Sequence, residues 1–407
     1  MSTAAQLPEP AFRLRVVASD IEGLAGKEIS AAAAPVTIGR GDDCAVVLKD
    51  KRVSRNHARI DAEGGGFLLR DLDSGNGIHV GEERVKELRL RHGARFRIVG
   101  TELEFVAPVV EAEVVAPFCQ DILVANEVVT PDKCRRLAAL ARSARLTVAV
   151  DSTAGLEAVA AAAAGAGVIV HVLVDVNVGQ NRCGVAPGDQ ALRLARAVQA
   201  SDAVVLDGVM GYEGHVQPMA GRQAREEAAR KAMQGLVATA ELIRSSGLPC
   251  GIVSAGGTGT FDISGRVTGV TEIQAGSYVL MDSDYGRLDL PFEQALFVLG
   301  TVVSRPSADR VIADCGHKAC SKDHGLPSVE GIEGAVVAGL NDEHATITVP
   351  ADSRLKVGDR LRLRPSHVDP TVNLHDVLYA VDGESVVGVW AVEARGYKTE
   401  REGLRLA

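Results

Sequence analysis

The segment Pro365-Ser366-His367-Val368-Asp369-Pro370 places an imidazole and a carboxylate two residues apart. In an extended segment such residues face the same side, so His367 and Asp369 can hold one divalent ion together. One nitrogen and one oxygen ligand with room for water suit Mn²⁺, Mg²⁺, Ca²⁺ or Zn²⁺ without selecting among them. Because most isolated pairs of this kind are solvated turn residues, their context in the chain has to decide.

A glycine-rich loop, Ser254-Ala255-Gly256-Gly257-Thr258-Gly259-Thr260, follows an apolar run, and its backbone N–H groups can approach a phosphate closely. The next apolar run ends in Gln274-Ala275-Gly276-Ser277-Tyr278, and the loop 175–184 is expected at the same rim. Glycine-rich turns are common, so one loop alone is a weak signal. Together these loops predict a site for a phosphorylated cofactor, with the candidate residues Arg182, Gly257, Thr258, Gly276 and Ser277.

Three turns near the N-terminus carry a second phosphate-binding pattern: Gly39-Arg40, Ser54-Arg55-Asn56-His57 and Ser74-Gly75-Asn76-Gly77. A phosphate dianion at a surface needs a guanidinium group, a hydroxyl donor and amide N–H groups that converge on it. Each residue alone would be an ordinary surface or turn residue, but three motifs in order favour binding. The candidate residues are Arg40, Ser54, Arg55 and Asn76.

Residues 12–106 read as short strands: FRLRVV, VTIGR, ARIDAE, FLLRDL and RFRIVG. Turn signals such as Gly64-Gly65-Gly66 and Gly75-Asn76-Gly77 separate them, and no long helix is indicated. We expect an all-β sandwich with binding loops at its ends, followed by a linker over residues 107–117.

Residues 118–298 alternate buried strands with helices, and we expect six parallel strands: DILVANE, LTVAVD, VIVHVLVDV, AVVLDG, CGIVSA and EIQAG. Thr130-Pro131 and Ala186-Pro187 are predicted helix starts. The pattern favours a TIM-like α/β barrel that is incomplete, because six strands cannot close an eight-stranded ring. Its two open edges need cover from the sandwich, a second copy in a homodimer, or local rearrangement.

Strands without long helices return over residues 299–407: RVIADCG, GAVVAGL, ATITVP, RLRLRP and SVVGVWAVEARG. They predict a third, β-rich lobe, so the chain of 407 residues is multidomain.

The composition limits the classes of protein. No apolar run reaches the roughly 20 residues of a membrane span, and no secretion signal is evident, so we expect a cytoplasmic protein. Seven cysteines without close C-x-x-C pairs favour reduced thiols. A net charge of −9 without a dense Lys/Arg tract argues against a nucleic-acid partner.

The N-terminal motifs resemble those of the forkhead-associated (FHA) domain, which carries Gly-Arg, Ser-Arg-x-His and Asn-Gly in this order. The resemblance implies a phosphothreonine-containing protein or peptide as partner. Arg40 and Ser54 would then contact the phosphate, with Arg55 assisting and Asn76 holding the peptide backbone. Gly39 and His57 are expected to brace the loops.

From about Ala112 onward the chain resembles the D-threonine aldolase and D-serine dehydratase-like family, an alanine-racemase-type pyridoxal-phosphate barrel with a β lobe. The matching stretches are DILVANEVV, VNVGQNRCGV, GYEGHVQ, SAGGTGT, EIQAGSYVLMD, DCGHKACSKDHGLP, NDEHATI and PSHVDPTVNLHD.

The family resemblance assigns expected roles to the candidate residues. Gly257, Thr258, Gly276 and Ser277 would face the phosphate of pyridoxal phosphate, and Arg182 would lie beside its pyridine ring. His367 and Asp369 would hold a divalent metal that binds the β-hydroxyl of a D-amino acid. Tyr212 and His215 are either rim residues or, for the histidine, a structural group.

The chain departs from that family at the lysine that anchors the cofactor as a Schiff base, within a His-x-Lys-Thr-His motif near the N-terminus. No lysine matches it, and the phosphopeptide module stands where that segment belongs. The earlier lysines lie in the sandwich or, for Lys133, at a helix start, and Lys318 and Lys322 belong to a different motif. Turnover should therefore fall by orders of magnitude.

Two functions stay open on the sequence. One is a phosphothreonine reader fused to a catalytically impaired, lyase-derived body. The other is an active pyridoxal-phosphate lyase on D-β-hydroxy-amino acids that uses a non-standard lysine or a partner chain that completes the barrel.

Overall fold

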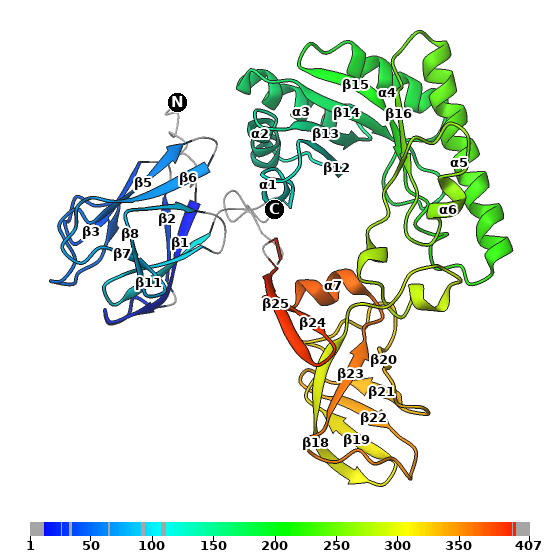
Figure 1. The fold of residues 1–407 in the computed structure, drawn as a ribbon. Helices are drawn as coiled ribbons and strands as arrows, with labels where there is room; N and C mark the ends of the chain where they lie inside the picture. The colour runs from blue at the N-terminus through cyan, green and yellow to red at the C-terminus, as the bar shows by residue number, and fades with distance from the viewer. Residues whose placement is uncertain are drawn as a thin grey trace, which may run out of the picture. The chain divides into compact units, whose positions relative to one another are not determined.

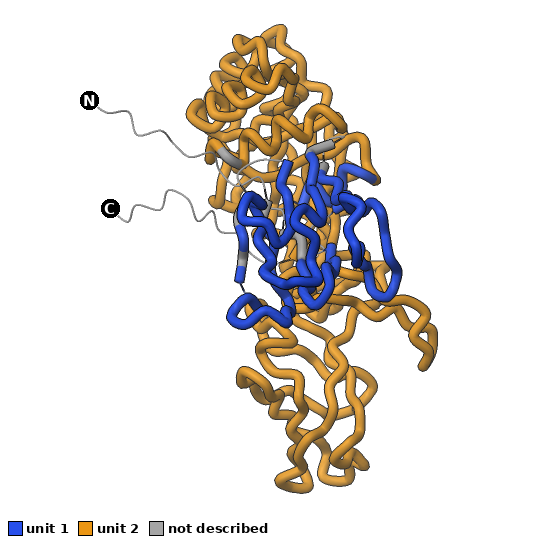
Figure 2. The backbone as a smooth tube through the Cα atoms, turned by 90° about the vertical axis from the view of Figure 1, so that its left-hand side faces the viewer, with its two compact units in different colours: residues 1–117, 397–407 blue, residues 118–396 orange. Residues whose placement is uncertain are grey.

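The computed structural model describes residues 12–25, 27–31, 35–63, 66–90, 94–106, 111–392 and 394–395. The chain divides into two compact units, and the boundary lies between Pro117 and Phe118 (Figure 2). Each unit is described separately below.

The first unit contains two β-sheets, with strand orders β2-β1-β11-β10-β7-β8 and β4-β3-β5-β6-β9. The five strands expected from the sequence are confirmed as β1, β3, β5, β6 and β10. Gly64 and Gly65 of the predicted glycine turn lie outside the described residues. The strands are β1 (Phe12–Ser19), β2 (Glu28–Ala31), β3 (Val36–Gly39), β4 (Val46–Val47), β5 (Ala58–Glu63), β6 (Gly66–Asp71), β7 (Ile78–Val80), β8 (Glu83–Val85), β9 (Glu87–Leu90), β10 (Arg95–Ile98) and β11 (Thr101–Val106).

Alternate residues of these strands form one apolar core. Leu14, Ile38, Ile60, Leu69 and Phe96 are at most 1% exposed and come from both sheets. Residues two apart on a strand face the same side, so this burial follows from the period-2 pattern of the sequence. The core leaves the loops between strands at the surface. Within the predicted linker, Glu111–Val115 form the short helix α1.

A six-stranded parallel sheet begins the second unit, with its strands in sequence order from β12 to β17. All six expected strands are confirmed. Within the described residues the sheet is open, with β12 and β17 at its edges, as expected of an incomplete barrel. The strands are β12 (Asp121–Glu127), β13 (Arg145–Val150), β14 (Val170–Asp175), β15 (Val204–Gly211), β16 (Ile252–Ala255) and β17 (Glu272–Ile273).

Helices connect the parallel strands and lie along one side of the sheet in Figure 1. Ala149, Leu173 and Met210 pack together from three neighbouring strands. Since all connections return in the same direction, every strand ends at one edge of the sheet, where its following loop begins. The helices are α2 (Pro131–Leu140), α3 (Thr153–Ala166), α4 (Asp189–Gln199), α5 (Arg222–Ser245) and α6 (Phe261–Ser264).

Helix starts test two of the sequence predictions. Helix α2 begins at Pro131, as expected. The start at Ala186-Pro187 is wrong, because α4 begins only at Asp189. Gly188 between them has φ +82°, a conformation outside the helical region, so the chain cannot enter the helix before this residue.

The second unit continues into a β lobe with strand order β20-β23-β18-β19-β22-β21 and a separate hairpin of β24 and β25 (Figure 1). The five expected strands are confirmed as β19, β21, β22, β23 and β25; the sequence analysis did not separate β18, β20 and β24. The elements are η1 (Ser277–Val279), η2 (Tyr285–Arg287), β18 (Val298–Ser307), β19 (Arg310–Ala313), β20 (Ser328–Val329), β21 (Val336–Leu340), β22 (Ala345–Thr348), β23 (Arg360–Arg364), α7 (Val368–Asn373), β24 (Val377–Asp382) and β25 (Ser385–Ala391).

Across the part of the chain that the structure describes, every helix is too short or too polar to cross a bilayer.

Candidate functional site

His57 connects two of the three loops that carry the predicted phosphate-binding motifs, the Ser54 loop and the Asn76 loop. Its Nδ1 accepts a hydrogen bond from the Ser54 N–H at 3.1 Å, and its Nε2 lies 3.0 Å from the Gly77 carbonyl oxygen. Because Nδ1 is an acceptor, Nε2 carries the proton and donates to Gly77. The imidazole is fully buried. It therefore braces the two loops, as the sequence predicted.

Backbone hydrogen bonds hold the third loop, which contains Gly39 and Arg40, against the Ser54 loop. Arg40 N–H donates to Ser54 O at 3.0 Å, and Gly41 N–H donates to Arg55 O at 3.1 Å. A Cβ atom on Gly39 would lie 2.1 Å from Arg55 O, so only glycine permits this approach. The expected bracing role of Gly39 is confirmed.

The cationic side chains of these loops share one shallow depression of about 490 Å³, lined by Arg40, Arg55, Lys49 and Lys51. The carboxylates of Asp42, Asp43 and Asp50 also line it, and Asp50 pairs with Arg52. Lys49 pairs with Asp42. Arg40 and Arg55 are exposed, and the described residues contain no carboxylate paired with either. The two guanidinium groups are therefore available to an external anion.

Ser54 and Asn76 lie beside this depression and are not part of its lining. Ser54 Oγ accepts a hydrogen bond from Gly75 N–H at 3.2 Å, and Asn76 Nδ2 donates to Arg52 O at 2.7 Å. All four predicted residues thus belong to loops that hydrogen-bond one another at one end of the sandwich.

In the second unit, buried Glu213 organises the glycine-rich loop. Its carboxylate accepts hydrogen bonds from Gly256 N–H at 3.1 Å, Thr260 Oγ1 at 2.6 Å and Ser264 Oγ at 2.7 Å. Gln217 accepts from Gly259 N–H at 2.8 Å. A buried carboxylate is stable only when hydrogen bonds satisfy it, so these donors fix the loop's shape.

The glycine-rich loop and the loop after β17 also have backbone N–H groups that are available to an anion. Thr258 Oγ1 accepts from Tyr278 N–H at 3.0 Å, which joins the loops after β16 and β17. Within the described residues, no acceptor is bonded to the backbone N–H of Thr258, Gly276 or Ser277. A Cβ on Gly276 would meet nothing within 4 Å, so there is open space beside these groups. Converging N–H groups of this kind suit a phosphate.

Arg182 lies over the Tyr212 ring, with its guanidinium carbon 5.9 Å from the ring centroid. Burial raises the pKa of Tyr212, whose hydroxyl is hydrogen-bonded to Tyr285. His215 is exposed and lies against the Arg182 loop, because a Cβ on Gly179 would be 2.9 Å from its ring. Tyr212 and His215, the predicted rim residues, thus both lie against the loop 175–184 that carries Arg182.

Asp282 ties the loop after β17 to the predicted metal motif. This fully buried carboxylate accepts from Val368 N–H at 3.0 Å and from Tyr285 N–H at 2.9 Å. Burial raises the pKa of Asp282. Since Asp369 also acts electrostatically on Tyr212 and Tyr285, the motif lies near the Arg182 loop.

The motif itself is surrounded by side chains that the sequence analysis did not single out. His367 Nδ1 is 2.5 Å from Asp323 Oδ2, and His367 Nε2 is 3.6 Å from Asp369 Oδ2. The carboxylates of Asp369 and Asp323 raise the pKa of His367 to about 9, and the shorter contact identifies Asp323 as the closer partner. The His324 ring stacks on that of His367 at 3.9 Å.

Three carboxylates, Glu127, Asp151 and Asp175, lie at the carboxyl ends of the first three parallel strands. Asp175 is 7% exposed, and burial together with a hydrogen bond to Glu127 raises the pKa of Asp175 to about 7. Asp151 accepts from Gly184 N–H at 3.2 Å. The sequence analysis missed this group, although parallel strands must bring their C-terminal residues together.

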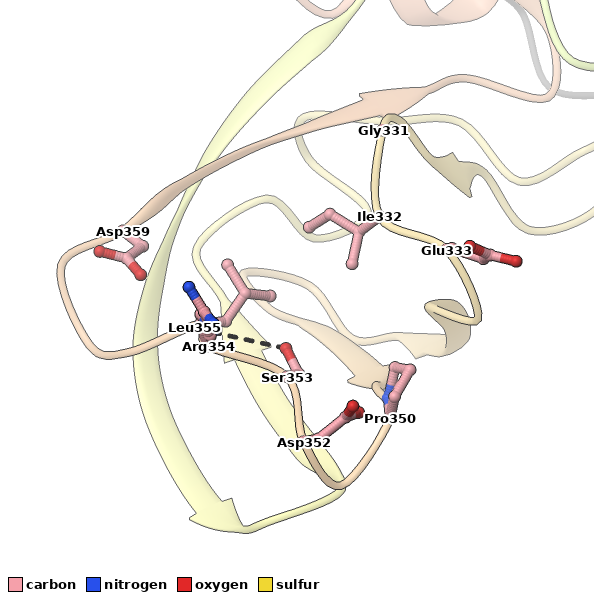
Figure 3. A pocket seen from close by; sticks show the side chains of 9 residues that line it. All are labelled: Gly331, Ile332, Glu333, Pro350, Asp352, Ser353, Arg354, Leu355 and Asp359. Carbon is pink, nitrogen blue, oxygen red and sulfur yellow. Dashed lines mark hydrogen bonds between the residues drawn. The ribbon is translucent and has the colours of Figure 1, made fainter.

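A separate hollow of about 420 Å³ lies in the β lobe, between the turn at Gly331 and the loop from Pro350 to Asp359 (Figure 3). Ser353 Oγ accepts from Leu355 N–H at 3.4 Å across this loop. None of the predicted site residues lines it.

Comparisons with known proteins match this arrangement. The family description "FHA domain" matches residues 36–99, "Alanine racemase, N-terminal domain" matches 92–284, and "Putative serine dehydratase domain" matches 295–381. D-threonine aldolase of Arthrobacter sp. is 44% identical over 290 residues, which cover 70% of this chain and 76% of the relative. The chain belongs to the D-threonine aldolase family. Its N-terminal unit is an FHA domain.

Solved structures of this family agree with the fold. The crystal structure of D-threonine aldolase from Filomicrobium marinum matches with a TM-score of 0.68 and 38% identity, covering 70% of this chain and 79% of that one. A mutant of D-threo-3-hydroxyaspartate dehydratase in its metal-free form matches with a TM-score of 0.64 and 28% identity, over 70% and 82% of the two chains.

Lysines in this D-threonine aldolase family member are all at the surface where the structure describes them. Ion pairs with carboxylates raise the pKa of Lys86, through Asp73, and of Lys318, through Glu343. A nucleophilic amine needs the opposite shift. The described lysines are Lys27, Lys49, Lys51, Lys86, Lys133, Lys231, Lys318, Lys322 and Lys356.

Proposed function

We propose that the chain is a phosphothreonine-peptide reader fused to a body that binds pyridoxal phosphate and a divalent metal and is catalytically impaired on its own. The single observation that carries the first half is the hydrogen-bonded convergence of the three FHA loops, which places Arg40 and Arg55 beside one depression.

Arg40 and Arg55, which pair with no carboxylate among the described residues, support a dianionic ligand at this depression. Two exposed guanidinium groups can each donate two hydrogen bonds to phosphate oxygens. Ser54 supplies a hydroxyl, and Asn76 supplies an amide for the peptide backbone. Contacts from several loops held by a fully buried His57 lower the ordering cost of binding.

Binding of a phosphothreonine peptide library to the full chain tests this proposal. Arg40→Ala and Ser54→Ala should each abolish binding, because each removes a phosphate contact. Arg95→Ala, an exposed arginine on β10, is the matched control for loss of one positive charge. Unchanged affinity in the Arg40 and Ser54 variants would contradict the proposed phosphopeptide binding.

The phosphate end of pyridoxal phosphate fits the second unit. The N–H groups of Thr258, Gly276 and Ser277 would hold the phosphate, and Arg182 would lie beside the pyridine ring. Gly257, also predicted to face the phosphate, donates its own N–H to Thr260 Oγ1 at 3.2 Å and would contribute through the shape of the loop. When bound, this cofactor supplies an electron sink for reactions at the α-carbon of an amino acid. The chain's own residues would orient the cofactor and hold its anionic end.

Among the residues that the structure describes, no lysine is placed to bind the aldehyde end of the cofactor. Every described lysine is exposed, and none belongs to the β-strand ends that surround the phosphate loops. Without a covalent anchor and its proton-transferring amine, turnover should fall by orders of magnitude relative to family members that possess one.

The second candidate function is an active lyase on D-β-hydroxy-amino acids. The glycine-rich loop is intact, and β12 and β17 have unpaired outer edges within the described part of the chain, where a partner chain could add strands; both features favour this candidate. D-threonine cleavage by the chain alone, with pyridoxal phosphate and Mn²⁺, separates the two: a rate within about tenfold of the Arthrobacter enzyme would support this candidate.

A further inference from the structure

Arg225 on helix α5 is a buried cation that no carboxylate neutralises among the described residues. It is fully buried, and its Nη1 donates to the Met219 carbonyl oxygen at 2.5 Å. Its Nε and Nη2 are buried and have no hydrogen-bond partner within the described part of the chain. Burial lowers the pKa of Arg225. A buried guanidinium in this state costs free energy until an anion or further acceptors satisfy it.

The two unpartnered nitrogens lie on one side of the guanidinium plane. Nε–H and one Nη2–H point in nearly the same direction, and this pair of donors matches the two oxygens of a carboxylate. Asp262, the carboxylate closest in sequence to the glycine-rich loop, is already held by Arg222, which donates to its two oxygens at 3.1 and 2.7 Å. Asp289 is exposed and forms no ion pair with Arg225. The donor pair of Arg225 is therefore open to another anion.

The same guanidinium lies at the N-terminal end of a long helix. Helix α5 begins at Arg222, and Gly221 at its N-cap has no side chain to cap it. The backbone N–H groups of residues 222–224 have no acceptor among the residues that the structure describes. Helix side chains tilt toward the N-terminus, and the bond to Met219 shows that Arg225 does so. Its charge thus adds to the attraction of the helix end for anions.

We propose that a small monovalent carboxylate binds here, with its two oxygens on Nε and Nη2 of Arg225 and its charge beside the N-terminus of α5. The full burial of Arg225 limits the ligand to an ion of the size of formate or acetate. Asp262 and Asp289 already act electrostatically on this guanidinium, so they repel a second negative charge such as that of a phosphate dianion.

The ion holds the turn between β15 and α5. Met219, which shares the Arg225 guanidinium with the ion, lies in the turn that also carries Glu213 and Gln217. These two side chains accept the hydrogen bonds that shape the glycine-rich loop. The proposed ion is therefore a structural ligand of the second unit, and its binding does not depend on the phosphopeptide, cofactor or metal proposals.

Thermal unfolding of the full chain in sodium formate, compared with sodium chloride at equal concentration, tests the proposal. We expect the wild-type Tm to rise, relative to chloride, by about 3 °C for each tenfold increase in formate above its Kd. Arg225→Met should lose this rise because it removes both donors, and Arg225→Lys should lose most of it because an ammonium has no planar fork. Arg230→Met, at an exposed arginine of the same helix, is the matched control and should respond like the wild type.

Line broadening of isotope-labelled formate by the folded chain, followed by NMR, gives a second readout that is independent of unfolding. We expect broadening that Arg225→Lys reduces and Arg230→Met retains. An equal Tm rise in chloride, or a formate response that survives in both Arg225 variants, would overturn the site, as would no response of the wild type.

Asp289→Asn separates this site from the alternative in which Asp289 itself neutralises Arg225. We expect the variant to keep its Tm without formate and to bind formate about twofold more tightly, because a competing negative charge is removed. A lower Tm without formate, together with unchanged formate binding, would identify Asp289 as the counter-ion and overturn the proposal.

Discussion

The Nε2 atom of His57 lies 3.0 Å from the carbonyl oxygen of Gly77, so one buried imidazole connects the Ser54 loop to the Asn76 loop. One loop precedes β5 and the other follows β6, and because Ala58 pairs with Asp71 both loops lie at the same end of this antiparallel pair. In the proposed phosphopeptide binding, the contribution of this histidine is therefore to hold the two loops together.

His57→Ala should weaken phosphopeptide binding although every phosphate-contacting side chain is retained. The variant leaves the Ser54 N–H and the Gly77 carbonyl without their partner, at a cost of roughly 1–3 kcal/mol in the free energy of unfolding. Isothermal titration and urea unfolding measure the two effects. Wild-type affinity in this variant would contradict the bracing role.

Gly39→Ala should also separate the loops, because the added Cβ would lie 2.1 Å from Arg55 O. We expect at least about a tenfold loss of phosphopeptide affinity, since the phosphate contacts depend on loop spacing. Gly75→Ala is the matched control: it lies in a neighbouring loop, and its Cβ would meet nothing within 4 Å. Equal affinities of the two variants would contradict the dependence of phosphopeptide affinity on the spacing between the Gly39 and Arg55 loops.

Glu213→Gln should destabilise the second unit by at least about 2 kcal/mol, because the amide offers a donor where three donors already point. It should also weaken pyridoxal-phosphate binding through the shape of the glycine-rich loop. Urea unfolding and cofactor titration provide the measurements, with the exposed Glu293→Gln as control. A stable variant with unchanged cofactor affinity would exclude this role for Glu213.

Asp175 should make stability depend on pH. Its pKa of about 7 in the folded chain exceeds its ordinary value of 3.8, so the folded protein holds the extra proton between these values. The free energy of unfolding should then fall by up to about 1.4 kcal/mol per pH unit as the pH rises from 4 to 7. Asp175→Asn should remove this slope, and the exposed Asp202→Asn should keep it.

The sequence predicted the strands of the open sheet because buried parallel strands are continuous apolar runs bounded by helices. It also predicted the FHA loops, because their three motifs occur in the order that is typical of the FHA domain. It placed the start of α4 too early, since the positive φ of Gly188 cannot be read from Ala186-Pro187. Strand β24 was missed because its hydrophobic side chains, such as Tyr379 and Val381, are exposed.

The candidate site was predictable only where its residues share a local motif. His367 and Asp369 are two positions apart, whereas Asp323 and His367 are 44 positions apart and meet through tertiary packing. Glu213 stands beside the predicted Tyr212, yet its role depends on burial against Thr260 and Ser264. Long-range contacts of this kind have no signature in the sequence.

Borohydride reduction of the full chain mixed with pyridoxal phosphate, followed by mass analysis of its peptides, distinguishes a chain that only holds the cofactor from one that forms an imine with it. Arthrobacter D-threonine aldolase serves as the positive control. We expect reversible cofactor binding and no lysine carrying a reduced pyridoxyl group. A stoichiometric adduct on one lysine of this chain, together with turnover of D-threonine, would contradict this expectation.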